Sequence, residues 1–282
     1  MCQRKCSTPW CAVLALCTPM VCAWDVRAEG GSGITPPVTP YRPSVSTPAQ
    51  LSAPGWLEGE FGLLRARSDS ASRDSAPFTL KLAFTPDWGI RLGGEALVRE
   101  DLSPSGFHYT IGDTAIVLKR RFGAGTDGDW GVFKNTAFGL EGGVIAPTGR
   151  DGIGQTAYTV NTIFSADLGA WHSDSNVYGT RLTLVDRGIG RWQQGWASSL
   201  SHAIGEHFSV EGELSGTRQR GTRDTAQVLA SGSYVLSSGS VVDFGMARSL
   251  QRLGATTQLF GGITMMLGRV RRQIPPGPRP PS

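Results

Sequence analysis

Long segments of this chain alternate apolar and polar residues with a period of two, and this pattern constrains the fold more than any other sequence feature. In residues 208–217, Val210 and Leu214 lie on one side of an extended backbone. Glu211 and Glu213 lie on the other side. Because successive side chains of a β-strand point to opposite faces, the alternation predicts strands with one apolar and one polar face.

The same alternation recurs through residues 56–268 and predicts twelve strands. Their predicted bounds are 56–66, 76–85, 87–99, 109–122, 132–146, 155–168, 176–186, 192–204, 207–218, 224–236, 239–249 and 256–268. Many are longer than the usual strand of a soluble protein, which has about five or six residues. A strand that spans a bilayer needs about 9–11 residues. The lengths therefore predict an all-β fold, an antiparallel transmembrane β-barrel of about 12 strands.

The connections between the predicted strands give an independent indication of the same fold. In outer-membrane barrels the periplasmic turns are short and the extracellular loops are longer. With the N-terminus in the periplasm, the even-numbered connections should be short, and 85–87, 205–206 and 237–239 are tight. The odd-numbered connections are longer and richer in Gly and Arg. Connection 123–131 is long where a short one is expected, and 169–175 is intermediate.

The two ends of the chain differ from the predicted barrel in composition. Residues 1–28 have a basic start, an apolar stretch and small-residue cleavage patterns, which predict a secretory signal peptide. Residues 29–55 are rich in Pro, Gly and Ser and predict a disordered lead-in. Residues 56–268 are predicted to form the outer-membrane β-barrel, and residues 269–282 are predicted to be a basic, Pro-rich tail. All 5 cysteines lie in residues 1–28, so the mature chain is predicted to lack disulfides, cysteine zinc sites and cysteine nucleophiles.

The composition excludes several other classes of protein. Gly accounts for 38 of 282 residues, and an interior Gly costs a helix roughly 1 kcal/mol, which argues against a helical bundle. Beyond the first 25 residues no run approaches the roughly 18 apolar residues of a spanning helix. Charged residues make up 18%, too few for a disordered polyelectrolyte. A net charge of +4 without a continuous basic face argues against nucleic-acid binding.

Charged residues on the polar strand faces would point into the barrel and are the candidate functional residues. The predicted lumen-lining residues are Lys81, Arg91, Glu95, Arg99, Lys119, Glu141, Asp167, Arg181, Glu211, Glu213 and Asp243. In an open pore such charges set the preference for ions or solutes. In a filled barrel they would instead pair across strands and stabilise the interior. The sequence leaves both interpretations open.

The pattern of polar residues predicts no enzyme, no bound metal and no cofactor. The histidines are His108, His172, His202 and His207. A lipid hydrolase needs a Ser–His pair, but Ser201 and His202 are adjacent and point to opposite faces of a strand. No metal-ligand spacing occurs in the sequence. The glycines of residues 149–154 lack the Lys-Ser/Thr ending of a phosphate-binding loop.

Four short motifs occur in a characteristic order within residues 56–268. They are Gly112-Asp113-Thr114 before Val117-Leu118-Lys119-Arg120-Arg121-Phe122; Val144-Ile145-Ala146-Pro147-Thr148-Gly149; Asp167-Leu168-Gly169 followed by Asn176; and Thr257-Gln258-Leu259-Phe260-Gly261-Gly262-Ile263-Thr264. In this order they resemble the outer-membrane β-barrel transporter family of the phenol-degradation meta-pathway type. The resemblance implies a barrel in the outer membrane of a Gram-negative envelope and the passage of small molecules. It implies no catalytic or binding residues.

Taken together, these patterns predict an outer-membrane, porin-like channel for the passive passage of small molecules, hydrophobic or aromatic ones included. A structural barrel with a filled lumen is the first alternative, and a lipid-modifying barrel enzyme is the second. The predicted partners are outer-membrane lipids, lipopolysaccharide, the small-molecule solute and the barrel-assembly machinery. Arg side chains near the long loops, such as Arg65 and Arg67, could bind lipopolysaccharide phosphates in bidentate fashion. The last strand runs into Leu267 and Gly268 without the usual terminal aromatic, so the assembly signal is either altered or internal.

Overall fold

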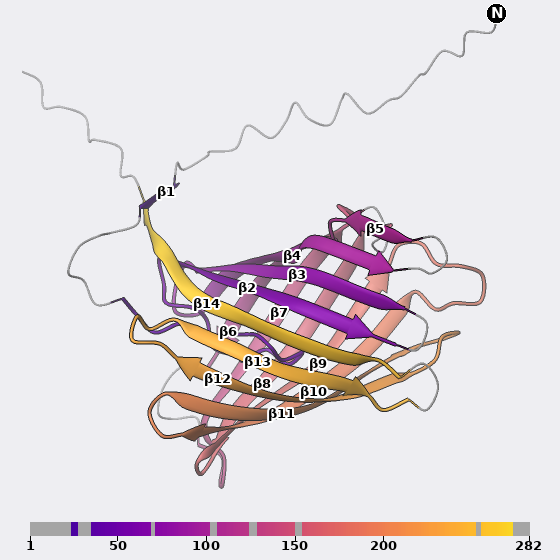
Figure 1. Cartoon of the computed structure of the whole chain (residues 1–282). Helices are drawn as coiled ribbons and strands as arrows, with labels where there is room; N and C mark the ends of the chain where they lie inside the picture. Colours follow the sequence, from indigo (N-terminus) through magenta and orange to yellow (C-terminus); the bar gives the residue numbers. More distant parts are fainter. Residues whose placement is uncertain are drawn as a thin grey trace, which may run out of the picture.

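The computed structural model of the chain is a closed β-barrel, as the alternation predicts (Figure 1). It describes residues 24–27, 35–68, 71–101, 106–123, 129–149, 154–251 and 255–272. All regular elements among these residues are β-strands. No helix in this part of the chain is long and apolar enough to cross a membrane.

The wall of the barrel is a continuous antiparallel sheet. Its strands are β2 (Trp56–Arg67), β3 (Ser72–Ala83), β4 (Trp88–Asp101), β5 (Phe107–Thr110), β6 (Thr114–Phe122), β7 (Lys134–Ala146), β8 (Ala157–Leu168), β9 (Trp171–Leu182), β10 (Trp192–Ile204), β11 (Phe208–Gln219), β12 (Thr225–Val235), β13 (Val241–Ser249) and β14 (Thr257–Arg272). Apart from β5, which pairs only with β4, the strands pair in the order of the sequence, and β14 pairs with β2 to close the sheet. Because β5 and β6 both pair with β4 and share one place in the wall, the barrel has 12 strands. The pairing of β14 with β2 removes the two edges that an open sheet of these strands would have, as a lipid environment requires.

The bounds of several predicted strands differ in the structure, most clearly those of 176–186 and 109–122. Strand β9 begins at Trp171 rather than at residue 176, because its pairing with β8 continues as far as Leu168. The sixth connection is therefore the tight turn Gly169-Ala170, with Gly169 at a φ of 63°. The predicted strand 109–122 is interrupted between β5 and β6. The sixth connection thus has the short length expected at its end of the barrel.

The last wall strand extends beyond its predicted end. Residues 269–272, predicted as part of a tail, continue β14 and pair with the short strand β1 (Trp24–Arg27). Strand β1 itself lies within the predicted signal peptide. The other residues of the predicted signal peptide, 1–23 and 28, lie outside the described residues, as do residues 273–282. The signal-peptide assignment stays a prediction.

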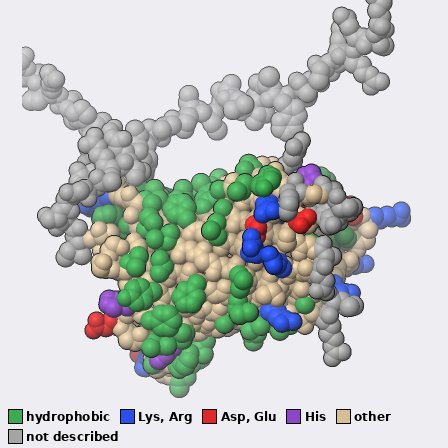
Figure 2. All heavy atoms as spheres, viewed as in Figure 1, with side chains coloured by type: hydrophobic (Ala, Val, Ile, Leu, Met, Phe, Trp, Pro, Cys, Tyr) green, Lys and Arg blue, Asp and Glu red, His purple; other side chains and the backbone are tan. Residues whose placement is uncertain are grey.

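The outer face of the wall is apolar around the barrel. Large hydrophobic side chains are exposed on β2, β6, β9 and β13, for example Leu63 (72%), Ile116 (54%), Val177 (65%) and Phe244 (57%). Figure 2 shows hydrophobic side chains spread over the visible wall, with a group of Lys and Arg side chains toward the end that carries β5. A water-soluble protein rarely exposes such a large apolar surface. The outer face therefore fits a barrel that spans a lipid bilayer.

Aromatic residues cluster on the outer face beside the connection between β6 and β7. Phe138 and Phe164 stack with ring centroids 5.2 Å apart, and Trp130 lies 5.4 Å from Phe138. Trp130 is 59% exposed and belongs to connection 123–131, which is long although it lies at the end of the barrel with the tight turns. Next to it, a hydrogen bond from Lys134 lowers the pKa of the Asp129 carboxyl. Aromatic rings flanked by charges are typical of a barrel surface at the membrane–water interface.

Candidate functional site

Residues 38–52, which precede the first wall strand, run inside the barrel, and we call them the plug segment. They form hydrogen bonds with inward side chains of β2, β3, β6, β8, β9 and β11. A segment that touches strands from opposite sides of a closed wall must lie in the lumen, where Figure 1 shows it. The structure thus differs from the predicted disordered lead-in over the described residues 35–55; residues 29–34 lie outside the described residues.

The plug segment enters the lumen and returns to the same end of the barrel. The Tyr41 hydroxyl donates a hydrogen bond to the carbonyl oxygen of Gln50 at 2.8 Å, which ties the two arms of the segment together. The returning arm leads to Gly55, whose N–H donates to the carbonyl of Ala83 at 2.8 Å. Ala83 ends β3 at the end of the barrel that carries the tight turns. The exposed turn at Val45 therefore faces the opposite end, where the long loops lie.

Two fully buried carboxylates of β2 hold the first arm. The N–H of Thr39 donates to both oxygens of Glu58 at 3.1 Å, and the N–H of Tyr41 donates to Glu60 Oε1 at 2.7 Å. Lys81 Nζ lies 2.5 Å from an oxygen of each carboxylate and also donates to the carbonyl of Thr39. Glu58 and Glu60 have 0% exposure. Buried charges persist only when they are paired and hydrogen-bonded, and here the backbone of the plug segment supplies part of that bonding.

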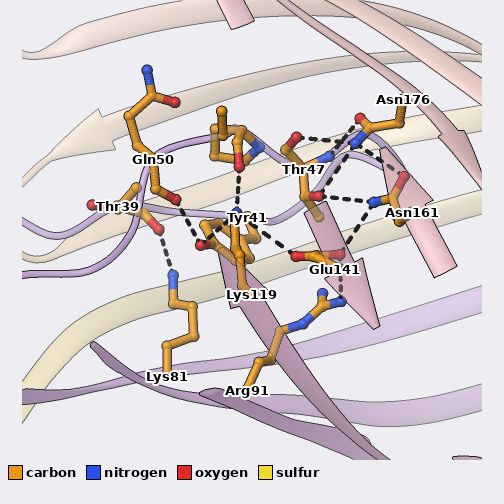
Figure 3. A network of polar contacts seen from close by, with 12 residues as sticks. Thr39, Tyr41, Thr47, Gln50, Lys81, Arg91, Lys119, Glu141, Asn161 and Asn176 are labelled. Carbon is orange, nitrogen blue, oxygen red and sulfur yellow. Dashed lines mark hydrogen bonds and ion pairs between the residues drawn. The ribbon is translucent and has the colours of Figure 1, made fainter. Parts of the chain in front are cut away.

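Tyr41 lies at the centre of the lumen among three cationic side chains (Figure 3). Lys81 Nζ is 4.0 Å and Lys119 Nζ is 4.3 Å from the centroid of its ring, with the Arg91 guanidinium at 5.9 Å. Lys119 Nζ also donates to the Tyr41 hydroxyl at 2.9 Å and to the carbonyl of Pro48. Cations over an aromatic face gain most where water is excluded. Tyr41 therefore couples the plug segment to β3, β4 and β6 at once.

Glu141 on β7 connects these cations to a set of amides. Its carboxylate lies 3.3 Å from Arg91 Nη2 and 3.7 Å from Lys119 Nζ. Asn161 Nδ2 donates to Glu141 Oε2 at 3.1 Å, and Asn176 joins the same network through Asn161 (Figure 3). Through Lys119 and Asn176 this network also bonds to the plug residues Tyr41 and Thr47.

The returning arm is bonded to the opposite half of the wall. The N–H of Thr47 donates to Asn176 Oδ1 at 2.9 Å, and the N–H of Ser46 donates to Glu213 Oε2 at 2.7 Å. The N–H of Ala49 donates to Ser165 Oγ at 2.8 Å, and Ala49 itself is fully buried. These bonds give the backbone of a non-strand segment the partners that a buried chain needs.

Inward-facing glycines make room for the plug segment. The Arg42 guanidinium lies against Gly62 on β2 and Gly262 on β14, which face each other across the strand pair. A Cβ at Gly62 would lie 2.3 Å from Arg42 Nη2. In this position Arg42 reaches Asp243, with Nη2 3.9 Å from Oδ1. Some of the high Gly content thus provides space for a chain inside the barrel.

We expect Gly62→Leu to displace Arg42 and loosen the plug segment by about 1–3 kcal/mol, the usual cost of overpacking. Proteinase K digestion of the protein in outer-membrane vesicles, followed by mass spectrometry, should show faster cleavage within residues 38–52. Gly142→Leu is the matched control, because no heavy atom lies within 4 Å of its Cβ position. Equal cleavage of both variants would contradict this role for Gly62.

Most of the predicted lumen-lining residues lie on the inner face of their strands, and many contact the plug segment. The inward group is Lys81, Arg91, Glu95, Lys119, Glu141, Asp167, Glu211, Glu213 and Asp243. Glu95 pairs with Arg73 at 2.5 Å and Asp167 with His172 at 2.6 Å, that is, with wall residues rather than with the plug segment. That these charges set solute preference stays a prediction.

The structure places Arg99 and Arg181 on the outer face, contrary to the prediction. In the pairing of β3 with β4, Pro77 faces Glu95 but Ser75 faces Val98, so β4 carries one extra residue. A bulge of this kind turns the following side chains to the opposite face, and Arg99 bonds to the outer-face Asp74 at 3.6 Å. Asn176 points inward, where it bonds to Thr47. Arg181 lies five positions after Asn176 and therefore points to the opposite, outer face, as the exposed Val177 does.

The histidines do not form a hydrolase site in the structure. His172 lies between Asp167 (2.6 Å) and Asp174 (3.4 Å), and His202 stacks on Trp171 with ring centroids 4.6 Å apart. Among the described residues, no serine hydroxyl is hydrogen-bonded to a histidine ring nitrogen. The same residues contain no group of three or more His, Cys, Asp or Glu placed to hold a metal ion.

Comparison with solved structures finds the same fold elsewhere. The chain resembles an outer-membrane channel from Pseudomonas putida F1 with a TM-score of 0.60 and 14% identity, over 79% of this chain and 98% of that one. It resembles the KdgM porin with a TM-score of 0.51 and 9% identity, over 73% and 97% of the two chains. No family model and no curated protein sequence matches the chain. At these identities the likeness shows the fold alone, the outer-membrane β-barrel that the motif resemblance implies.

Proposed function

We propose that this chain is an outer-membrane channel for small molecules, closed by the plug segment and opened when that segment moves. The observation that carries the proposal is the lumen itself, which is wide enough to hold a whole re-entrant chain. An eight-stranded barrel is just wide enough for its own side chains or one small ligand, and the interior widens as strands are added. Displacement of the plug segment would therefore leave a passage lined by charged and amide side chains.

Polar cavities on both sides of the plug segment support this proposal. A cavity of about 490 Å³ lies between the plug segment and the wall residues Arg121, His172 and Glu211. A second cavity of about 320 Å³ lies beyond the turn at Val45. Both volumes fall within or near the usual range for small-ligand sites. The plug segment thus borders two spaces whose volumes suit small solutes.

A structural barrel with a permanently filled lumen is the second candidate. The observation that favours it is the set of buried ion pairs, such as Lys81 with Glu60, because breaking one of them is costly. Swelling of liposomes that contain the full chain distinguishes the two candidates. A channel admits neutral solutes such as glycerol faster than protein-free liposomes do. Neither solute uptake nor current steps in planar bilayers would leave the structural barrel as the function.

A lipid-modifying enzyme remains the least favoured alternative. His172, the histidine with carboxylate partners, is hydrogen-bonded to acids rather than to a serine. Deacylase or phospholipase activity in detergent, abolished by His172→Asn, would support the enzyme. Absence of that activity in the full chain would leave the two non-enzymatic candidates.

We propose that the Arg65–Asp74–Arg99 group on the outer face binds lipopolysaccharide phosphates. Arg65 Nε lies 2.6 Å from Asp74 Oδ1, and Arg99 Nη1 lies 3.6 Å from Asp74 Oδ2. The group carries a net positive charge, and guanidinium forks suit phosphate. Arg65→Ala should lower the amount of lipopolysaccharide that copurifies with the barrel, and an unchanged amount would contradict the proposal. The barrel-assembly machinery as a partner and a preference for hydrophobic or aromatic solutes stay predictions.

A further inference from the structure

The cavity beyond the turn of the plug segment has an unusual lining for a barrel with so many inward charges. Every side chain that lines it is uncharged, and most carry a hydroxyl or an amide. It lies among the ends of β11, β12, β13 and β14 that lead into the long loops. The charged side chains that bond the plug segment lie deeper in the barrel. We call this space the vestibule.

Two glutamines present unused hydrogen-bonding groups to the vestibule. Gln227 lies on the inner face of β12 between Ser215 of β11 and Ser249 of β13 in the strand register. Gln258 lines the same cavity from β14. In the described part of the chain, neither side-chain amide has a hydrogen-bond partner. Each amide therefore offers both a donor and an acceptor to a solute or to water.

An aromatic ring completes the vestibule on the side of β9. Tyr178 packs so closely on Gly195 of β10 that a Cβ there would lie 2.3 Å from the ring. The absence of a side chain at Gly195 therefore lets the ring lie against the wall. Across from Tyr178, Thr217 and Thr225 share a hydrogen bond of 2.6 Å at the edge of the cavity. The vestibule thus combines a flat apolar surface with neutral donors and acceptors.

We propose that the vestibule is a binding site for neutral polyhydroxylated solutes, of the class of short saccharides. Such solutes have many hydroxyls, which pair with amides and hydroxyls, and apolar C–H faces, which pack on an aromatic ring. An ion would find no counter-charge among the residues that line the site. A purely apolar solute would leave the amides of Gln227 and Gln258 unpaired, and sites built for hydrogen bonding reject such analogues strongly.

The vestibule is also adjacent to the part of the plug segment that must move for passage. Val45 forms part of its lining, and the neighbouring Ser44 and Ser46 are hydrogen-bonded to Glu211 and Glu213. A solute bound here would rest on the turn of the plug segment. A saccharide site here would give the proposed channel its class of solute. Passage of the solute rests on the proposed function, but binding does not, because the vestibule is open without movement of the plug segment.

Titration calorimetry of maltose with the full chain in lauryldimethylamine oxide, a detergent without sugar groups, tests the proposal. We expect saturable binding of maltose, with glucuronate and phenol each bound more weakly. The double variant Gln227→Met and Gln258→Met keeps side-chain length but removes two amides, and should weaken maltose binding about tenfold. The single variant Gln227→Met serves if the double variant does not fold. Gln194→Met is the matched control, because Gln194 is exposed on the opposite face of β10 from the inward Gly195 and Ala197.

The outcomes separate this inference from the proposed channel. Absence of saturable maltose binding, equal binding by both glutamine variants and the wild type, or tighter binding of phenol would each overturn the vestibule as a saccharide site. Maltose binding that depends on Gln227 and Gln258 supports the site even if liposomes show no solute passage. In that case the channel fails and the binding site stands.

Discussion

Replacing residues 38–52 with a flexible Gly/Ser linker of equal length raises the single-channel conductance by about tenfold, because a 12-strand barrel is wider than one that its own side chains fill and the linker would not dock in its lumen. A Gly/Ser chain lacks the side chains of Tyr41 and Arg42 that hold the segment among the wall charges. It would remain flexible and solvated rather than docked. Planar-bilayer recordings of the purified barrel give the measurement.

The control for this replacement is a Gly/Ser substitution of residues 220–224, the loop between β11 and β12. This loop is exposed and lies outside the plug segment, so the conductance of the loop variant should match that of the wild type. If the plug replacement conducts no better than this control, the plug segment is not what closes the lumen. Heat-modifiable mobility on gels verifies that both variants form a barrel.

The second large effect concerns the buried ion group on β2 and β3. Lys81→Met leaves Glu58 and Glu60 buried without their cation, which costs about 3–5 kcal/mol for an uncompensated buried charge. The wall itself is held by its backbone ladder, so the strain falls on the docking of the plug segment. We expect faster proteinase K cleavage within residues 38–52 and more frequent channel openings.

Two further variants make the second prediction specific to the charges. Lys81→Met combined with Glu58→Gln and Glu60→Gln removes all three charges and should restore much of the docking, because no unpaired charge remains. Lys134→Met removes an exposed ion pair with Asp129, which should have little effect. Wild-type cleavage and openings in Lys81→Met alone would show that the ion group does not hold the plug segment.

The wall of the barrel could be predicted from the sequence because each wall strand obeys one simple rule. Lipid on the outside demands apolar side chains at every second position, as in β11 with Val210 and Leu214. The face was wrongly predicted for Arg99, where this rule is interrupted, and for Arg181, on a strand whose two faces both mix apolar and polar residues. The extra residue of β4 turned Arg99 outward, and a single bulge leaves little trace in a pattern of apolar and polar residues.

The plug segment could not be predicted in the same way, because its own residues follow no periodic pattern. Pro40, Pro43 and Pro48 make it look like a linker, and most of its bonding partners are wall side chains distant in the sequence. A signal was nevertheless present in β2, where Glu58 and Glu60 occupy the inward positions of the first strand. Two acids side by side in a lumen require partners, and Lys81 alone cannot satisfy all their oxygens.

The most direct test of the central claim, that the plug segment closes a channel, is a reversible cross-link between the plug segment and the wall. The Ala49 N–H lies 2.8 Å from Ser165 Oγ, so the Cα separation is below about 7 Å, the limit beyond which a disulfide cannot form without backbone movement. All 5 native cysteines lie in residues 1–28, so a chain that begins at residue 29 carries only an introduced pair. Ala49→Cys with Ser165→Cys should show no openings in planar bilayers when oxidised and wild-type openings after reduction. Equal openings in the oxidised and reduced states would contradict the account.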